Sequence, residues 1–235
     1  SLLPSDLNCM EELKVADSMA YRRASYIKSV TSYPLCKNEE IEYFAIGEDY
    51  FERLVEDLKK AEKYILIEYF IIARGKLWDR IYDILKSKAA SGVEVSIIAD
   101  EWGSITRYPK HFFSECFKYG IEIYRYNPIR YGISNYMNFR DHRKIVVIDG
   151  IVAYTGGVNI ADEYINAHQR FGHWKDNGVR LTGEVVKSFT ISFLCNLEIA
   201  SKTKVDYEWY INEIEKNIPK LKNNEKGFVQ YFSDG

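Results

Sequence analysis

The chain has 235 residues and a formal net charge of −2, with 46% hydrophobic and 28% charged residues. This composition is typical of a soluble globular protein and excludes a disordered or fibrous chain, and the length suffices for one sizeable α/β domain or two small ones. The near-neutral charge argues against nucleic-acid binding through bulk positive charge, and no apolar run approaches the roughly 20 residues of a membrane span.

Helical and strand-like patterns alternate along the chain. Residues 1–36 are polar and mostly helix-compatible, and we expect them to form an N-terminal helical extension. Beyond them, hydrophobic spacing predicts strands at residues 40–46, 64–70, 93–99 and 121–126, with helices at residues 47–58, 77–90 and 109–120 between them. This alternation predicts the α/β class, with a mixed, largely parallel β-sheet flanked by helices on both faces.

The second half of the chain continues this pattern after a long loop at residues 127–141. Two short strands surround Asp149-Gly150, a dipeptide typical of a tight hairpin. A further strand is expected at residues 174–181, and closing helices at residues 185–200 and 206–217. A charged run at residues 220–226 then precedes a short strand-like segment.

The cysteines and histidines show no metal-ligand spacing. Cys9, Cys36, Cys116 and Cys195 are far apart, so we expect four unpaired thiols in a reducing compartment. We expect neither a metal nor a cofactor.

His142 and Lys144 precede a short run of Ile and Val that is typical of a buried strand. Because they are two residues apart, their side chains should leave the same face of that strand. An imidazole and an ammonium that share one space suit a phosphate diester, since the first can attack phosphorus and the second can neutralise the oxygens. Between residues 107 and 144, eight basic residues against three acids add local positive charge.

Four further residues stand at set offsets after this pair. Asp149 lies at the predicted hairpin turn, where a structural role is favoured over a catalytic one. Gly156 and Gly157 have no side chains, so their backbone N–H groups can approach an anion closely. Asn159 adds a side-chain donor. The plain alternative is an ordinary hairpin with a charged edge.

The resulting pattern, H-x-K-x4-D-x6-G-G-x-N, resembles the HKD signature of the phospholipase D superfamily. Over roughly residues 33–235 the chain resembles the first half of a bacterial cardiolipin synthase. The similar segments are Ile65–Phe70, Ala90–Val95 leading into Asp100, Asn138–Lys144 and Gly157–Tyr164. On this resemblance, residues 37–217 are the catalytic domain with one HKD motif, and residues 218–235 are a linker and the start of a missing second half.

The resemblance implies a metal-free, two-step transfer through a phosphohistidine. It makes His142 the catalytic histidine, with Lys144, Asn159 and the Gly157 backbone holding phosphate oxygens. Asp149 is the aspartate of the signature, and Asp176 falls where the family places an acid that orients the imidazole. Many family members have serine at the position of Gly157, so this chain lacks one hydroxyl donor there.

The implied mechanism needs two histidines, but the chain carries one motif. The sequence from His173 to Lys175 begins like a second motif, but Arg180 stands in place of the aspartate and no glycine-asparagine turn follows. The second histidine would therefore come from a second HKD half or from a second copy of the chain.

The leading functional hypothesis is phosphatidyl transfer that joins two phosphatidylglycerols into cardiolipin. The alternatives are a homodimeric phosphodiesterase or nuclease of the same superfamily and a catalytically inert phosphate-binding half domain. Nucleic acid is the less favoured partner. We expect the parent protein at the cytoplasmic face of the cell membrane and this chain alone to be soluble. Aromatic residues and arginines at residues 127–139 suit contact with the membrane surface, packing beneath the loop or base stacking.

Overall fold

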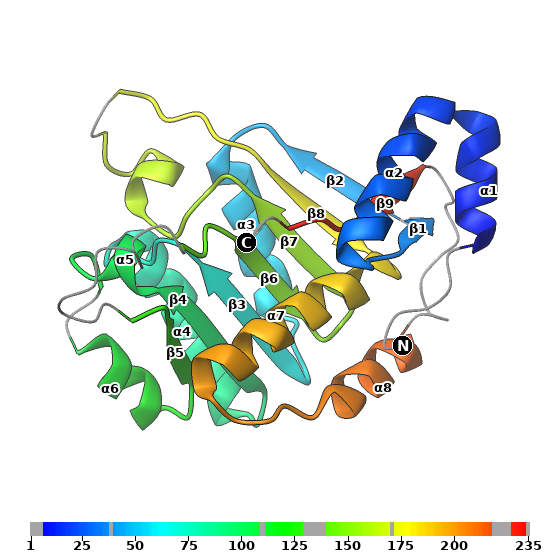
Figure 1. The fold of residues 1–235 in the computed structure, drawn as a ribbon. Helices are drawn as coiled ribbons and strands as arrows, with labels where there is room; N and C mark the ends of the chain where they lie inside the picture. Colours follow the sequence, from blue (N-terminus) through cyan, green and yellow to red (C-terminus); the bar gives the residue numbers. More distant parts are fainter. Residues whose placement is uncertain are drawn as a thin grey trace, which may run out of the picture.

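The computed structural model describes residues 7–37, 40–108, 111–128, 140–169, 172–217 and 227–233 (Figure 1). The first half contains α1 (Leu7–Ala16), α2 (Ser18–Thr31), β1 (Leu35–Lys37), β2 (Ile41–Phe44), α3 (Gly47–Leu58), β3 (Tyr64–Tyr69), α4 (Lys76–Ala90), β4 (Glu94–Asp100), α5 (Glu101–Ser104), α6 (Phe112–Lys118) and β5 (Glu122–Tyr126). The second half contains β6 (Lys144–Ile148), β7 (Val152–Gly156), the 3-10 helix η2 (Asp162–Ile165), β8 (Gly178–Thr182), α7 (Val185–Ser201), α8 (Tyr207–Asn217) and β9 (Phe228–Gln230).

Seven of these strands form one mixed sheet in the order β2-β8-β7-β6-β3-β4-β5, which confirms the expected α/β class. The sheet is less parallel than expected, because β3, β4 and β5 run parallel while the other described neighbours pair antiparallel. The reason is the length of the connections. Parallel neighbours need a crossover, which α4 and α6 provide, whereas β6 and β7 are joined by a tight turn that reverses the chain.

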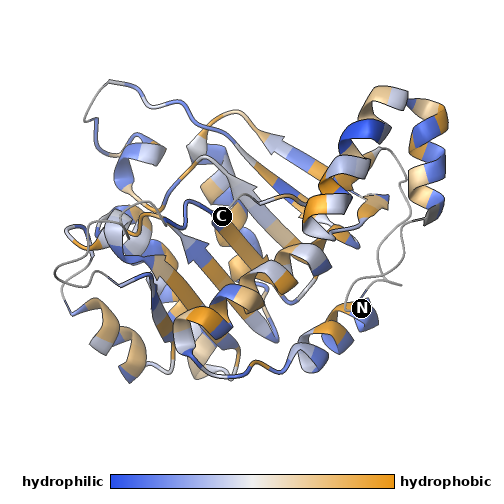
Figure 2. Ribbon diagram, in the orientation of Figure 1, coloured by the Kyte–Doolittle hydropathy of each residue, from blue (hydrophilic) through white to orange (hydrophobic). Residues whose placement is uncertain are grey.

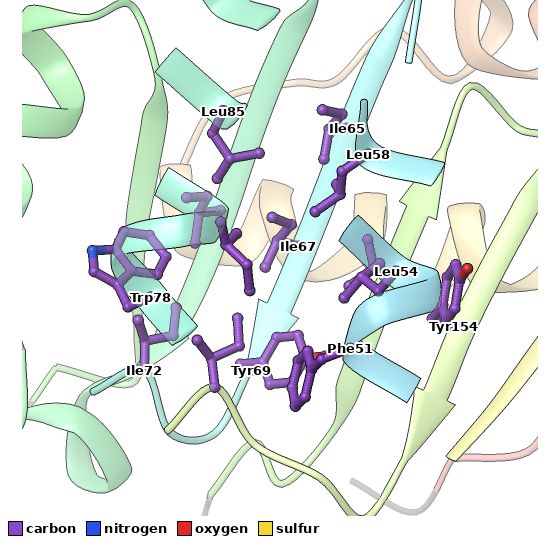
Figure 3. Close-up of a cluster of buried hydrophobic side chains, with 14 of the residues drawn as sticks. Phe51, Leu54, Leu58, Ile65, Ile67, Tyr69, Ile72, Trp78, Leu85 and Tyr154 are labelled. Atoms are coloured by element: carbon purple, nitrogen blue, oxygen red, sulfur yellow. The ribbon is translucent and has the colours of Figure 1, made fainter. Parts of the chain in front are cut away.

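Helices cover both faces of the sheet and divide its core in two. On one face, α3 and α4 pack against β3, as Figure 3 shows for Leu54, Leu58, Trp78 and Leu85 around Ile65, Ile67 and Tyr69. On the other face, α7 and α8 cover the alternate strand residues, among them Leu66, Ile145 and Val147. The central strands β3, β4 and β6 are therefore buried on both sides, and Figure 2 shows much of their length in the hydrophobic colour.

The N-terminal segment of the described chain packs against its last strand. β9 pairs antiparallel with β1, and Phe228 packs against the small core of α1 and α2 (Figure 1). Tyr231 then enters the α7 side of the main core, where its ring centroid lies 4.7 Å from those of Tyr33 and Phe189. The strand-like segment expected near the end of the chain is thus a strand that pairs within the described structure. In those same ranges, no helix is both long and apolar enough to cross a bilayer.

The hairpin between β6 and β7 is held by the side chain of Asp149. Asp149 and Gly150 both have positive φ angles, 54° and 65°, as a tight two-residue turn requires. The Asp149 carboxylate accepts hydrogen bonds from the backbone N–H groups of Glu62 (2.7 Å), Lys63 (2.7 Å) and Tyr64 (2.8 Å). It therefore ties the hairpin to the start of β3, which is the structural role favoured by its turn position.

We expect Asp149→Ala to lower the free energy of unfolding by about 2–4 kcal/mol, because three backbone donors lose a charged acceptor. Urea denaturation followed by circular dichroism measures this change. Asp83→Ala is the matched control, since the Asp83 carboxylate pairs with Lys86 and is largely exposed, and it should change stability by less than about 0.5 kcal/mol. Equal midpoints for the two variants would contradict the assigned role of Asp149.

Candidate functional site

The candidate site lies at one edge of the sheet. β3, β4 and β7 end at this edge, and the antiparallel strands β6 and β8 begin there. Lys144 is opposite Tyr69 in the register, and Gly156 is opposite Gly178. Strand ends at the point where the chain changes direction are where open α/β sheets commonly bind ligands.

His142 and Lys144 come together at this edge, as their spacing predicts. Lys144 is the first residue of β6 and only 3% exposed, whereas His142 lies just before the strand and is exposed. The Lys144 Nζ lies 3.1 Å from His142 Nδ1 and donates to the His142 carbonyl oxygen at 2.6 Å. The Phe70 ring packs against both residues, with its centroid 4.7 Å from that of the imidazole and 5.5 Å from Nζ. The pair thus sits half in the protein and half in solvent.

Burial shifts the acid–base behaviour of both groups. It lowers the pKa of Lys144 to about 8, although Asp141, Asp176 and Asp100 partly counteract it. Burial and, next, the neighbouring ammonium lower the pKa of His142 below its ordinary value of 6.5. At neutral pH the imidazole is therefore neutral while the ammonium stays charged.

Gly157 and Asp176 lie against each other at the same edge. A Cβ atom on Gly157 would lie 2.1 Å from the Asp176 Oδ1, so glycine provides clearance for the segment that precedes β8. The Gly157 N–H donates to the Asn177 carbonyl oxygen at 3.0 Å and is therefore engaged within the protein rather than presented to an anion. Asp176 is near enough to Lys144 to raise its pKa. Among the hydrogen bonds of the described residues, however, none joins Asp176 to His142, whose Nδ1 faces Lys144.

Asn159 is buried directly behind the pair. Its Oδ1 accepts from the Ile71 N–H at 3.1 Å, and its Nδ2 donates to the Tyr164 hydroxyl at 2.8 Å. These bonds connect the segment after β7 with the segment after β3, and an isolated bridge between Ile72 and Ile160 reinforces the connection. The structure thus shows Asn159 bracing the site, and its expected contact with phosphate remains a prediction.

Asp149 is not brought to this edge. It lies five residues beyond Lys144, at the opposite end of β6, and a strand rise places it roughly 16 Å away. A catalytic contact for Asp149 is incompatible with this position. Its spacing in the motif serves the hairpin that holds β6 in place.

The second, incomplete motif also has a structural explanation. His173 and Lys175 are exposed, and Lys175 precedes β8. Arg180 lies within β8 and is buried, with its Nε 2.7 Å from Asp57 Oδ2. Its charge is used in an ion pair between β8 and α3, which agrees with counting one motif.

A buried ionic cluster lies behind His142, and its presence was not predicted from the sequence. Arg143 points to the opposite face from its neighbours, where its Nη2 lies 3.2 Å from Glu68 Oε1 and its Nε donates to Asp141 Oδ1 at 2.8 Å. Asn196 of α7 donates to the same Glu68 oxygen at 2.6 Å. Glu68 could have indicated this cluster in the sequence, because an acid in the otherwise apolar run from Tyr64 to Tyr69 needs a buried partner.

Metal chemistry has no evident ligand set here: across the described ranges, no three His, Cys, Asp or Glu residues are grouped so as to hold an ion.

The fold is shared with solved structures of the phospholipase D class, and a match to a PLD-like family model over residues 54–189 places the chain in that class. The fold is similar to those of NucT from Helicobacter pylori (TM-score 0.55, 16% identity, 68% of this chain and 97% of that chain) and of a phospholipase D family member, Nuc, from Salmonella typhimurium (TM-score 0.51, 15% identity, the same coverage). It is also similar to phosphatidylserine synthase from Haemophilus influenzae Rd KW20 (TM-score 0.55, 14% identity, 89% of this chain and 50% of that chain).

Sequence comparison narrows this class to one family. Residues 54–189 match the family described as cardiolipin synthase, PLD-like domain, and the chain belongs to that family. It is 38% identical over 176 residues to a cardiolipin synthase of Listeria monocytogenes serotype 4b, covering 74% of this chain and 36% of that protein. It is 40% identical over 229 residues to an uncharacterized protein of Streptococcus mutans serotype c, covering 97% of this chain and 48% of that protein. The chain thus spans less than half the length of these relatives.

Removing the cation of the buried cluster should destabilise the fold. We expect Arg143→Met to lower the free energy of unfolding by about 3–5 kcal/mol, because it leaves buried carboxyl groups without their partner. Adding Glu68→Gln should recover at least about 1 kcal/mol, since the two residues interact directly. Both changes are measured by urea denaturation.

Arg80→Met is the control for this experiment. Arg80 pairs with Glu52 on the exposed surface, so its loss should cost less than about 1 kcal/mol. An Arg143→Met variant that is no less stable than Arg80→Met would show that the cluster does not support the fold.

Proposed function

We propose that this chain provides one half of the catalytic site of a phosphatidyl transferase that makes cardiolipin from two phosphatidylglycerols. The observation that carries the proposal is the 3.1 Å approach of Lys144 Nζ to His142 Nδ1 at the sheet edge, where His142 is exposed. Membership of the cardiolipin synthase family supports the choice of substrate.

In the first step of this proposal, a nitrogen of the neutral His142 imidazole attacks the phosphorus of one phosphatidylglycerol. A P–N bond forms, the P–O bond to glycerol breaks, and the departing glycerol oxygen takes a proton from a second histidine. Lys144 neutralises charge on the non-bridging phosphate oxygens. The lowered pKa of His142 favours the neutral form that this attack requires.

In the second step, the terminal hydroxyl of another phosphatidylglycerol gives its proton to the second histidine and attacks the same phosphorus. The new P–O bond replaces the P–N bond, and His142 is released. Transfer rather than hydrolysis requires that water be kept from the intermediate. The negative charge of Asp176 would help to keep Lys144 protonated. Asn159 would hold the segment after β7 in place.

The second histidine lies outside this motif. We infer that residues 37–217 form the catalytic half and that residues 218–235 lead into a second half, in agreement with the partial coverage of longer relatives. The alternative source of the histidine is a second copy of this chain. In support of this alternative, this chain covers 97% of the NucT and Nuc chains, so that each of them corresponds to a single half. In that case a homodimeric phosphodiesterase acting on nucleic acid is the alternative function.

The parent protein would act at the cytoplasmic face of the cell membrane, where its lipid substrate is found. The segment expected to touch the membrane surface, residues 127–139, lies mostly outside the described residues. Its role therefore rests on its aromatic and basic composition.

The direct test is turnover of phosphatidylglycerol vesicles, with cardiolipin and glycerol measured by mass spectrometry. From the chain joined to its second half, or from a dimer of this chain, we expect both products and a loss of at least about a thousandfold with His142→Ala. His173→Ala is the matched control, because His173 is exposed and outside the motif, and it should retain activity. DNA cleavage without lipid turnover would instead support the nuclease, and a monomer inert toward both would support a phosphate-binding half domain.

The pH dependence follows from the burial of Lys144. Because the charged ammonium is the active form and its pKa is about 8, kcat/KM should fall about tenfold per pH unit at pH values above 8. Lys144→Arg should move this decline to higher pH, since guanidinium keeps its proton. A kcat/KM that stays constant from pH 7 to beyond pH 9 would contradict a role for the Lys144 charge.

A further inference from the structure

Two buried acids lie on the core side of the segment that carries His142. Glu68 of β3 has no exposed surface and Asp141 is 4% exposed. The two carboxyl groups are close enough that Asp141 raises the pKa of Glu68. One cation, Arg143, contacts both. Two carboxylates against one guanidinium would leave an uncompensated negative charge in the protein interior, which is costly.

The hydrogen bonds show which oxygens remain available. Glu68 Oε1 accepts from Asn196 and contacts Arg143, and Asp141 Oδ1 accepts from the Arg143 side chain and backbone. The other two oxygens, Glu68 Oε2 and Asp141 Oδ2, are buried without a partner among the described residues. Two ionised carboxylates can only accept, whereas a protonated one can donate. A proton shared between the two carboxyl groups would give both of these oxygens a partner.

We propose that Glu68 and Asp141 share one proton, and that this acid pair is a positioning device that holds His142 in place for phosphoryl capture. The pair then carries one negative charge, which Arg143 balances. The positioning role rests on the proposed function of His142, whereas the shared proton does not.

The surrounding groups favour this protonation state. Burial and, next, Asp141 raise the pKa of Glu68 well above its ordinary value, against Arg143 and Asn196. From β4, the Asp100 carboxylate faces Asp141 through the Asp141 N–H, and its own pKa is also raised by burial. The phenols of Tyr126 from β5 and Tyr231 from the segment after β9 complete the surroundings, and burial raises the pKa of both, so they remain neutral.

The pair can position His142 because Asp141 directly precedes that residue and its carboxylate accepts from the backbone N–H that directly follows it. The Asp141 N–H donates to Asp100 Oδ2 at 3.0 Å, and the Arg143 N–H donates to Asp141 Oδ1 at 3.2 Å. Loss of the proton would set two buried carboxylates against each other. Asp141 would move away from Glu68, and the adjacent His142 would move with it.

Infrared spectroscopy tests the proton directly. The difference spectrum between the wild type and Glu68→Gln at pH 7 should contain the carbonyl stretch of a protonated carboxylic acid. Glu94→Gln is the control, because burial also raises the pKa of Glu94 but it lies at the far end of β4, so this variant should keep the band assigned to Glu68. A Glu68→Gln difference spectrum without an acid carbonyl band would overturn the shared proton.

Stability as a function of pH gives an independent readout. The pKa of Glu68 is raised by folding, so the stability that its protonation provides is complete below the unfolded value of about 4.3 and is lost as pH rises toward the folded value. The amide introduced by Glu68→Gln cannot ionise. The unfolding equilibrium constant of the wild type, divided by that of Glu68→Gln, should therefore rise up to about tenfold per pH unit above pH 4.3. A ratio that is constant between pH 5 and pH 8 would overturn the proposal.

Kinetics with phosphatidylglycerol test the positioning role. Glu68→Gln can still donate to Asp141 and should keep kcat within about threefold of the wild type. Glu68→Leu and the shorter Glu68→Asp should each lower kcat at least about tenfold with little change in KM, because binding of lipid does not involve this buried residue. Circular dichroism shows which of Glu68→Leu and Glu68→Asp is folded, and the folded variant decides the outcome. A folded variant with the kcat of the wild type would overturn the positioning role. A wild type that makes no cardiolipin would instead refute the proposed function, while the infrared and stability measurements would still decide the shared proton.

Discussion

The alternation of side chains as the chain enters β6 is the constraint on which the rest of this structure depends. His142 and Lys144 leave one face, and Arg143 between them leaves the other. His142 and Lys144 therefore reach the sheet edge because Arg143 is anchored in the opposite core. A shift of one residue would exchange these faces and bury the imidazole among the helix α7 side chains.

The anchor and the reactive pair have opposite electrostatic requirements. Arg143 stays fully charged because two acids surround it, and their effect raises its pKa although burial opposes it. Lys144 lies nearly buried with acids only at longer range, so burial dominates and its pKa falls to about 8. Two neighbouring residues thus carry a permanently charged guanidinium on the core side and, at the sheet edge, an ammonium that loses its proton more easily. That difference is a property of the two faces and not of the residue types alone.

The site is also braced by the residues that surround it. Gly157 leaves room for Asp176, and Asn159 joins the segments after β3 and β7, so the edge is built from several strands that end together. At the far end of β6, Asp149 fixes the hairpin to β3. The spacing of the signature therefore links the His142–Lys144 pair at the start of β6 with the chain reversal at its end. The α7 face links this arrangement to the ends of the chain, since Ser192 contacts both Arg143 and Tyr231.

The sequence by itself determined the α/β class, the order of the elements and the proximity of His142 to Lys144. These follow from local properties: hydrophobic residues repeat every 2 residues in strands and every 3.6 residues in helices, and certain dipeptides form tight turns. It also determined the hairpin at Asp149-Gly150 and the exclusion of His173 as a second motif. The proportion of parallel pairing, the engagement of the Gly157 N–H and the cluster of Glu68, Asp141 and Arg143 were decided only by the tertiary structure. Residues 68, 141 and 143 come from segments that β-pairing and helix α7 bring together, and no local pattern records which buried acid will meet which cation.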